Sequence, residues 1–229
     1  MSLAARCGLE LIGTFFLMLV VATAAVGGMA GGMAPFAIGG ILMAMIYMAG
    51  PHSGGHFNPA VTLGFLVRGG LPAREVVPYI LAQLIGAFLA AMVQMVLLEN
   101  AGSADGALAL AALGEEGGRI ADALQVGIAE LLFTFALVLV ILNVASAPGQ
   151  APNQYFGLAI AVTVMAGAFA VGPVSGAVFN PAVLLGLWSL GATSGVMFAV
   201  ILATTLCGGL LAALTFRAVH GIEASPGEG

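Results

Sequence analysis

Long apolar runs make up most of the chain, and short stretches with glycine, proline or charged residues separate them. A helix needs about 20 apolar residues to cross a bilayer, and six runs approach or exceed this length. The pattern therefore predicts six transmembrane helices, at approximately Leu9–Val26, Pro35–Ala49, Val76–Leu98, Ala121–Val144, Phe156–Val171 and Gly195–Phe216.

Two further apolar segments, Pro59–Val67 and Pro181–Leu190, are too short to span a bilayer, and each follows an asparagine. Asparagine is a favoured N-cap and proline fits the first helical turn, so each Asn-Pro pair predicts a helix start. Short segments in corresponding halves of a chain are typical of broken helices inside a membrane. The predicted fold class is an all-α membrane protein with six transmembrane helices and two re-entrant half-helices.

Two sequence blocks recur along the chain. ELIGTFFLMLV from Glu10 matches ELLFTFALVLV from Glu130 at 7 of 11 positions, with an offset of 120 residues. SGGHFNPAVTLG from Ser53 matches SGAVFNPAVLLG from Ser175 at 9 of 12 positions, with an offset of 122. The similar offsets indicate a duplicated unit, with repeat 1 at about 1–100 and repeat 2 at about 119–217. Since three spans separate equivalent positions, we expect an inverted repeat within one transmembrane domain, residues 1–229.

The composition agrees with a membrane protein and excludes several other classes. Hydrophobic residues make up 61% of the chain and charged residues 7%, whereas a soluble domain carries about a quarter charged residues. We therefore expect an integral membrane protein in contact with the lipid bilayer. The chain has no basic tract, so it is not expected to bind nucleic acid.

The arginines lie unevenly about the predicted spans, and the side with more positive charge normally faces the cytoplasm. This places both termini in the cytoplasm. The membrane itself is expected to be the inner (plasma) membrane of a bacterium. The connection Glu99–Gly118 is expected to be an exposed outer loop, and the tail 218–229 to be disordered. The arginines on the cytoplasmic side would be Arg6, Arg68, Arg74 and Arg217, with Arg119 on the other side.

The residues before each Asn-Pro pair predict non-helical backbone, which survives inside a membrane only if buried in protein or lining a water-filled cavity. Half-helices from opposite faces would meet near the midplane, with both positive N-termini directed at one place. There the amides of Asn58 and Asn180 could donate hydrogen bonds to a passing solute, while the positive ends repel cations and protons. The expected acceptors are the backbone carbonyls of Gly54, Gly55, His56, Gly176, Ala177 and Val178.

With SGxxFNPAV in both halves and a glutamate in the first and fourth spans, the chain resembles the aquaporins, the major intrinsic protein family. The resemblance implies a passive channel rather than an enzyme, without cofactor or metal, that forms a homotetramer with one pore per subunit. It also implies that Glu10 and Glu130 have a structural role as buried carboxylates, and that His56 braces its loop. The pore motifs that it implies are Asn58, Pro59, Ala60, Asn180, Pro181 and Ala182.

The chain departs from this family at the four positions that usually form the outer selectivity filter. Water channels usually carry Phe at the first and often His at the second, and the family almost always has Arg at the last. Losing that Arg removes five N–H donors and a fixed charge, so the resemblance implies a wide, apolar filter. The residues at the four positions are Ile38, Ala168, Ala177 and Val183.

Such a filter predicts passage of water and larger uncharged solutes, and the resemblance suggests metalloid acids or organic arsenicals among them. One alternative is a facilitator for glycerol, urea, ammonia or hydrogen peroxide. A different class is a proton-coupled secondary transporter, because inverted repeats with broken helices build those too. In that case Glu10 and Glu130 would be the only carboxylates available near the midplane.

Overall fold

The computed structural model describes residues 1–98, 120–150 and 153–221, and all the regular secondary structure in these ranges is helical. Within these ranges, six helices are long and apolar enough to cross a membrane, and two shorter helices begin at the Asn-Pro pairs. The predicted outer loop lies outside the described residues. The helices are α1 (Leu3–Val20), α2 (Ala34–Ser53), α3 (Pro59–Arg68), α4 (Ala73–Leu97), α6 (Ile120–Ser146), α7 (Phe156–Ser175), α8 (Pro181–Ser189) and α9 (Gly195–His220).

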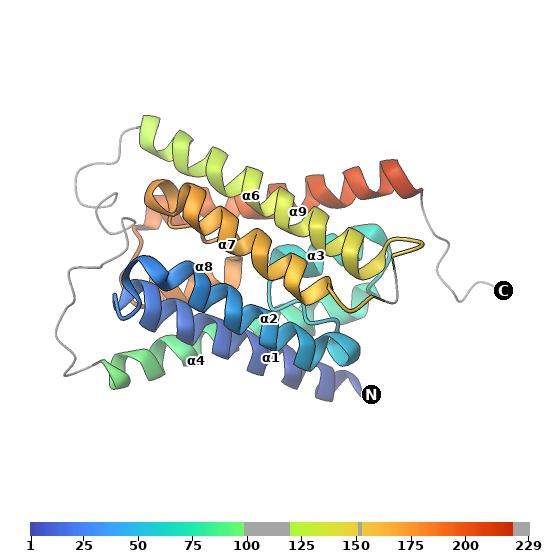
Figure 1. The fold of residues 1–229 in the computed structure, drawn as a ribbon, viewed down its shortest axis with the longest axis horizontal. Helices are drawn as coiled ribbons and strands as arrows, with labels where there is room; N and C mark the ends of the chain where they lie inside the picture. The colour runs from blue at the N-terminus through green and yellow to red at the C-terminus, as the bar shows by residue number, and fades with distance from the viewer. Residues whose placement is uncertain (99–119, 151–152, 222–229) are drawn as a thin grey trace.

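The two halves have the same arrangement, turned upside down relative to each other. Helix α3 lies toward the end of the molecule where α1 begins and α9 ends, and α8 lies toward the opposite end (Figure 1). At a rise of 1.5 Å per residue, the ten residues of α3 extend about 15 Å, half of a bilayer core. Helices α3 and α8 therefore enter from opposite sides and begin near the middle, as expected from the sequence.

Close helix contacts depend on glycines at equivalent places in the halves. A Cβ atom on Gly86 of α4 would lie 2.4 Å from the carbonyl oxygen of Leu11 in α1. A Cβ atom on Gly208 of α9 would lie 2.6 Å from the carbonyl oxygen of Leu131 in α6. Both distances are too short for any side chain, so glycine lets each helix pair approach at its backbone.

Several helices extend beyond the predicted apolar runs. Helices α2 and α7 continue past Pro51 and Pro173, whereas the predicted spans stop just before these prolines. A proline near the last turn removes one N–H donor but does not end the helix; the left-handed glycines Gly54 and Gly176 do. The extra residues bring Ser53 and Ser175 to the non-helical loops.

The ends of the chain also differ from prediction. Helix α1 begins at Leu3, where the Ser2 hydroxyl caps it, and its last turn continues as a π-helix over Val21–Val26. Helix α9 runs to His220, so the first three residues of the predicted disordered tail are helical. The rest of that tail, 222–229, lies outside the described residues.

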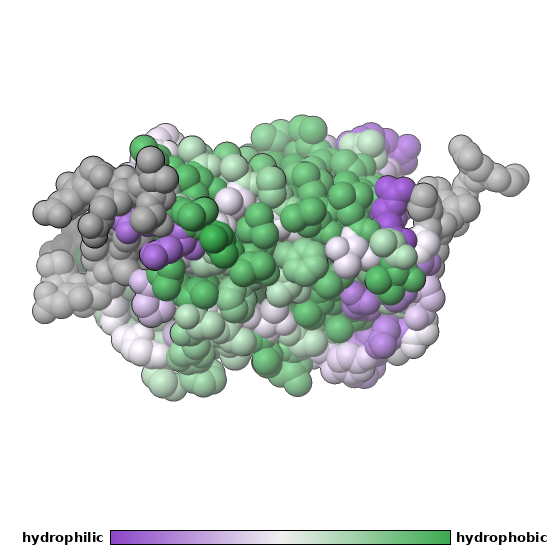
Figure 2. Space-filling view, turned by 90° about the horizontal axis from the view of Figure 1, so that it is seen from above, coloured by the Kyte–Doolittle hydropathy of each residue, from purple (hydrophilic) through white to green (hydrophobic). Residues whose placement is uncertain are grey.

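The outer surface of the helices is apolar. Hydrophobic residues cover the middle of the face in Figure 2, and hydrophilic residues gather toward the ends. Exposed large side chains of this kind include Val77, Leu81 and Phe88 on α4, and Leu158 and Phe169 on α7. A soluble monomer rarely exposes so continuous an apolar surface, which agrees with an integral membrane protein.

Candidate functional site

The non-helical loop before α3 is held by the carboxylate of Glu10, which is fully buried in α1. The backbone N–H groups of His56 and Phe57 donate hydrogen bonds to its two oxygens, with N···O distances of 3.0 and 2.7 Å. The hydroxyl of Ser53 and the side-chain amide of Gln83 also donate to it, at 2.7 and 2.9 Å. The N–H groups of this loop have no carbonyl partner because the loop is not helical, and Glu10 therefore supplies their acceptors.

Glu130 of α6 does the same for the loop before α8. It accepts from the backbone N–H groups of Val178 and Phe179 at 2.9 and 2.7 Å, and from the hydroxyl of Ser175 at 2.6 Å. It is also fully buried. Because neither Glu130 nor Glu10 borders the central cavity described below, their geometry favours the structural role over a proton relay.

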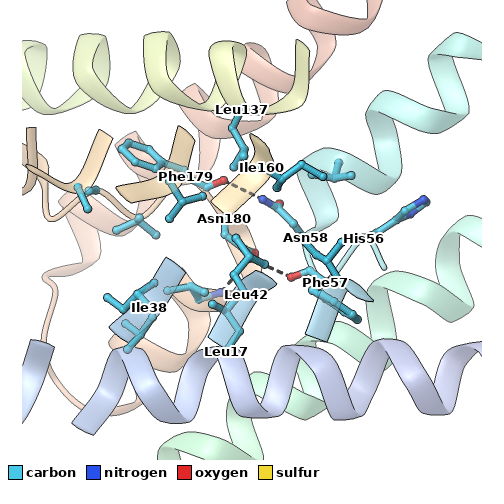
Figure 3. Close-up of a pocket in the computed structure, with 18 of the residues that line it drawn as sticks. Leu17, Ile38, Leu42, His56, Phe57, Asn58, Leu137, Ile160, Phe179 and Asn180 are labelled. Atoms are coloured by element: carbon cyan, nitrogen blue, oxygen red, sulfur yellow. Dashed lines mark hydrogen bonds between the residues drawn. The ribbon is translucent and has the colours of Figure 1, made fainter. Parts of the chain in front are cut away.

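The two loops meet through a reciprocal pair of hydrogen bonds. The side-chain nitrogen of Asn58 donates to the carbonyl of Phe179, and that of Asn180 donates to the carbonyl of Phe57, both at 2.9 Å (Figure 3). The oxygen of each side-chain amide accepts from the backbone N–H two residues later, at Ala60 and Ala182, and so caps its helix. Since an amide nitrogen carries two hydrogens, each asparagine keeps one N–H for another acceptor.

Phe57 and Phe179 carry these accepting carbonyls, and both have a left-handed backbone with φ of 49°. This conformation costs a bulky residue about 1–3 kcal/mol and persists only where its surroundings enforce it. Here the carboxylates bind the N–H groups of both residues. The rings are buried as well: the ring of Phe179 stacks on Phe133 with centroids 5.6 Å apart.

A central cavity lies between the halves, with about 70 Å³ open to the centres of water-sized molecules. One water needs about 10–15 Å³ on this measure, so the cavity has room for several. Among the described residues that line it, polar side chains come from His56, Asn58 and Asn180. The remaining wall consists of apolar side chains and loop backbone.

Most residues singled out in the sequence lie in this wall. All four positions of the expected outer filter line the cavity: Ile38, Ala168, Ala177 and Val183. The loop residues Gly55, His56, Gly176 and Val178 also line it. Gly54 does not line it; this residue forms the left-handed turn that ends α2 and donates its N–H to the carbonyl of Gly50. Its carbonyl is therefore not among the acceptors of the cavity wall. Four residues of the predicted pore motifs do not line it either, because they are buried in the first turns of α3 and α8: Pro59, Ala60, Pro181 and Ala182.

Sequence reasoning missed a large part of the apolar wall. The internal repeat could have indicated three of these residues, because an offset of 122 relates them to predicted filter positions. Ile160 corresponds to Ile38, Ile46 to Ala168, and Val61 to Val183. The other wall residues have no sequence signal besides apolar character. The missed residues are Leu17, Val21, Ala25, Leu42, Ile46, Phe57, Val61, Leu137, Ile141, Ile160, Val164, Phe179 and Leu187.

The histidines next to the first loop have different environments. The ring of His56 is buried, with Nδ1 3.2 Å from the hydroxyl of Thr62, and it stacks on Phe65 with centroids 4.4 Å apart. These contacts support the loop-bracing interpretation. His52 is exposed in the last turn of α2. No group of three potential metal ligands occurs among the residues that the structure describes.

Comparison with known proteins gives concordant results. Residues 10–216 match the family model described as "Major intrinsic protein". The chain is 32% identical to Aquaporin AqpM of Methanothermobacter thermautotrophicus, covering 94% of this chain and 97% of that protein. It is 36% identical to Aquaporin NIP1-4 of Oryza sativa subsp. japonica, covering 84% and 69%. The solved structure of the aquaglyceroporin from Plasmodium falciparum shares the fold, with a TM-score of 0.77, 22% identity and coverage of 95% and 97%.

Proposed function

Since this chain belongs to the major intrinsic protein family and is a membrane channel for water and small solutes, we propose that its filter admits uncharged solutes larger than water. The observation that carries this proposal is the wall at Ile38, Ala168, Ala177 and Val183, where every side chain is apolar. These four positions carry no charged side chain that could bind a solute or narrow the passage with a bulky head group.

The central asparagines would supply the polar steps of permeation. A solute beside Asn58 and Asn180 can accept a hydrogen bond from each amide, and backbone carbonyls of the loops can accept from its hydroxyl or amino groups. Few polar partners are available elsewhere in the wall, so solutes with an apolar part suit this pore better than strongly hydrated ones. The positive N-termini of α3 and α8 disfavour cations and protons at the centre.

Metalloid acids and organic arsenicals are the solute class that we favour, because they are neutral and wider than water. Glycerol, urea, ammonia and hydrogen peroxide are the alternative. Of the three proteins compared above, one is named an aquaglyceroporin and two are named aquaporins. These names are consistent with either group of solutes.

The test is a set of solute fluxes through purified protein reconstituted into liposomes, followed by the light scattering of shrinking and swelling vesicles. We expect water, glycerol, urea and undissociated arsenous acid to permeate faster than through protein-free liposomes. Permeation of water alone would refute the wide filter. Solute accumulation against its gradient, driven by a pH difference and lost in Glu10→Gln, would instead support a coupled transporter.

We further propose that the channel is a homotetramer in a bacterial plasma membrane with both termini in the cytoplasm. Its support is the family resemblance and the position of three arginines toward the end of the molecule where α1 begins and α9 ends. These arginines are Arg6, Arg68 and Arg217. Chemical cross-linking in native membranes tests the assembly, and protease cleavage of a C-terminal tag in sealed, oriented vesicles tests the topology. A monomer, or a tag cut only from outside the cell, would contradict the respective statement.

A further inference from the structure

The cavity wall contains two rings of residues that the internal repeat relates to each other. We define the α8-end ring as Ile38, Ala168, Ala177 and Val183. Subtracting or adding the offset of 122 residues gives its counterpart. We define this α3-end ring as Ile160, Ile46, Gly55 and Val61, which also line the cavity.

Contacts between the antiparallel helices α2 and α7 fix the level of each ring. The rings of Phe36 and Phe169 touch at one end, with centroids 5.1 Å apart, and those of Tyr47 and Phe156 touch at the other, 5.2 Å apart. This pairing sets Ile38 level with Ala168, and Ile46 level with Ile160. Figure 3 accordingly shows Ile38 and Ile160 on opposite sides of the central asparagines.

The two rings differ in how much of each side chain a water-sized sphere can reach. In the α3-end ring, Ile46, Val61 and Ile160 are 3%, 1% and 4% exposed, and Gly55 is partly exposed. In the α8-end ring, Val183 is 4% exposed, but its three companions are all partly exposed. A water-sized sphere therefore hardly reaches the aliphatic groups of the α3-end ring, whereas it reaches three of the four residues of the α8-end ring.

The extent of the cavity shows the same asymmetry. One turn beyond the α8-end ring, Ala25 and Leu187 still line the cavity. Their counterparts beyond the α3-end ring, Ala145 and Phe65, are not part of the cavity wall. Phe65 instead stacks on the buried ring of His56. The cavity thus continues past the α8-end ring and stops at the α3-end ring.

We propose that Ile46, Val61 and Ile160 form the constriction that selects solutes by size. This inference rests on the proposed channel function and adds to it the residues that set the size limit. All three side chains are β-branched, so they have few rotamers, and their packing leaves them little room to move aside. A solute too wide for this ring would pass the α8-end ring and then be stopped.

The repeat supplies a matched pair of variants for the test. Ile46→Ala gives the α3-end ring the residue that the α8-end ring has at Ala168, and Ile38→Ala removes the same number of atoms from the α8-end ring. The measurement is the ratio of glycerol permeability to water permeability in proteoliposomes with equal amounts of folded protein. We expect Ile46→Ala to raise this ratio severalfold, and Ile38→Ala to leave it within twofold of the wild type.

Two milder variants keep the proposal testable if Ile46→Ala does not fold. Ile46→Val and Ile160→Val each remove one methylene group, and we expect each to raise the ratio in the same direction. A wild type that conducts, combined with unchanged ratios in the folded α3-end variants, would overturn this inference alone. An equal or larger increase in Ile38→Ala would overturn it too. Absence of any protein-dependent flux in the wild type would refute the channel function itself.

Discussion

The two repeats build the same loop geometry with different surroundings. In each, a buried carboxylate accepts hydrogen bonds from one serine hydroxyl and from two consecutive backbone N–H groups. Around Glu10 of repeat 1, further polar groups complete the network: Gln83 donates to the carboxylate and to Thr62, whose hydroxyl lies near His56. The equivalents of these three residues in repeat 2 are Thr205, Leu184 and Val178.

The difference also reaches the end of the molecule where α1 begins. Arg6 forms an ion pair with Glu75, with an N···O distance of 2.7 Å, and Tyr79 donates to the carbonyl of Ser53 at 2.9 Å. The equivalents of Arg6, Glu75 and Tyr79 in repeat 2 are Val126, Met197 and Ile201. These three are buried in the apolar core.

The comparison separates the hydrogen bonds that each loop needs from polar groups that only repeat 1 has. In both halves the carboxylate accepts hydrogen bonds from two backbone N–H groups of the loop, because a buried N–H without an acceptor is costly. These N–H groups belong to His56 and Phe57 in repeat 1 and to Val178 and Phe179 in repeat 2. The additional polar groups of repeat 1 have no counterparts in repeat 2, so the same backbone can be held without them. Substituting first the residues that both repeats share, and then a residue that only repeat 1 has, tests this distinction.

The largest effect is expected from Glu130→Ala compared with Glu10→Ala. Each variant leaves two buried backbone N–H groups without an acceptor, at about 1–3 kcal/mol per group. In Glu10→Ala, the side-chain amide of Gln83 can turn its oxygen, which has no partner, toward the loop. We therefore expect Glu130→Ala to lower the thermal unfolding midpoint of the detergent-solubilised protein more than Glu10→Ala does. The reverse order would contradict a compensating role of Gln83.

A smaller and equal effect is expected from Asn58→Leu and Asn180→Leu. Each loses a helix cap, at about 0.5–2 kcal/mol, and a hydrogen bond to the opposite loop, at about 0.5–1.5 kcal/mol. Because the two donor distances are the same, the unfolding midpoints should fall alike, and solute flux should fall in both. Normal flux through both folded variants would show that these amides do not serve permeation.

Val183→Arg should change selectivity more than stability. The arginine would bring a bulky head and a positive charge to the α8-end ring, which has room for it beside Ile38 and Ala168. Flux of bulky neutral solutes should drop most and water flux less, as measured by proteoliposome swelling. Val183→Leu, which adds bulk without charge, is the control. An unchanged ratio between a small and a bulky solute would mean that Val183 does not border the passage.

The smallest effect is expected from Gln83→Met, which removes a polar group that repeat 2 lacks. Glu10 would keep three of its donors, and the unpartnered oxygen of Gln83 would disappear with the amide. We expect a stability loss of about 1 kcal/mol and unchanged solute flux, because Gln83 does not line the cavity. A large loss of flux in the folded variant would assign Gln83 a part in conduction.

The sequence by itself determined the six spans, the two short helices and the inverted repeat. Each of these follows from the sequence pattern: apolar runs as long as a bilayer is thick, Asn-Pro pairs that start helices, and two repeated blocks with nearly the same offset. The filter positions also lay in the cavity wall, although they were identified through the family resemblance. Their part in selectivity stays a proposal.

Only the tertiary structure decided which groups from the two halves meet. The bond from Asn58 to the carbonyl of Phe179 joins residues 121 positions apart, and no local pattern records it. Local apolar character likewise does not separate Ile46, which lines the cavity, from Ile12, which is exposed on α1. The depth and rotation of each helix are set by packing at sites such as Gly86 and Gly208. Packing therefore decides which aliphatic side chains surround the passage.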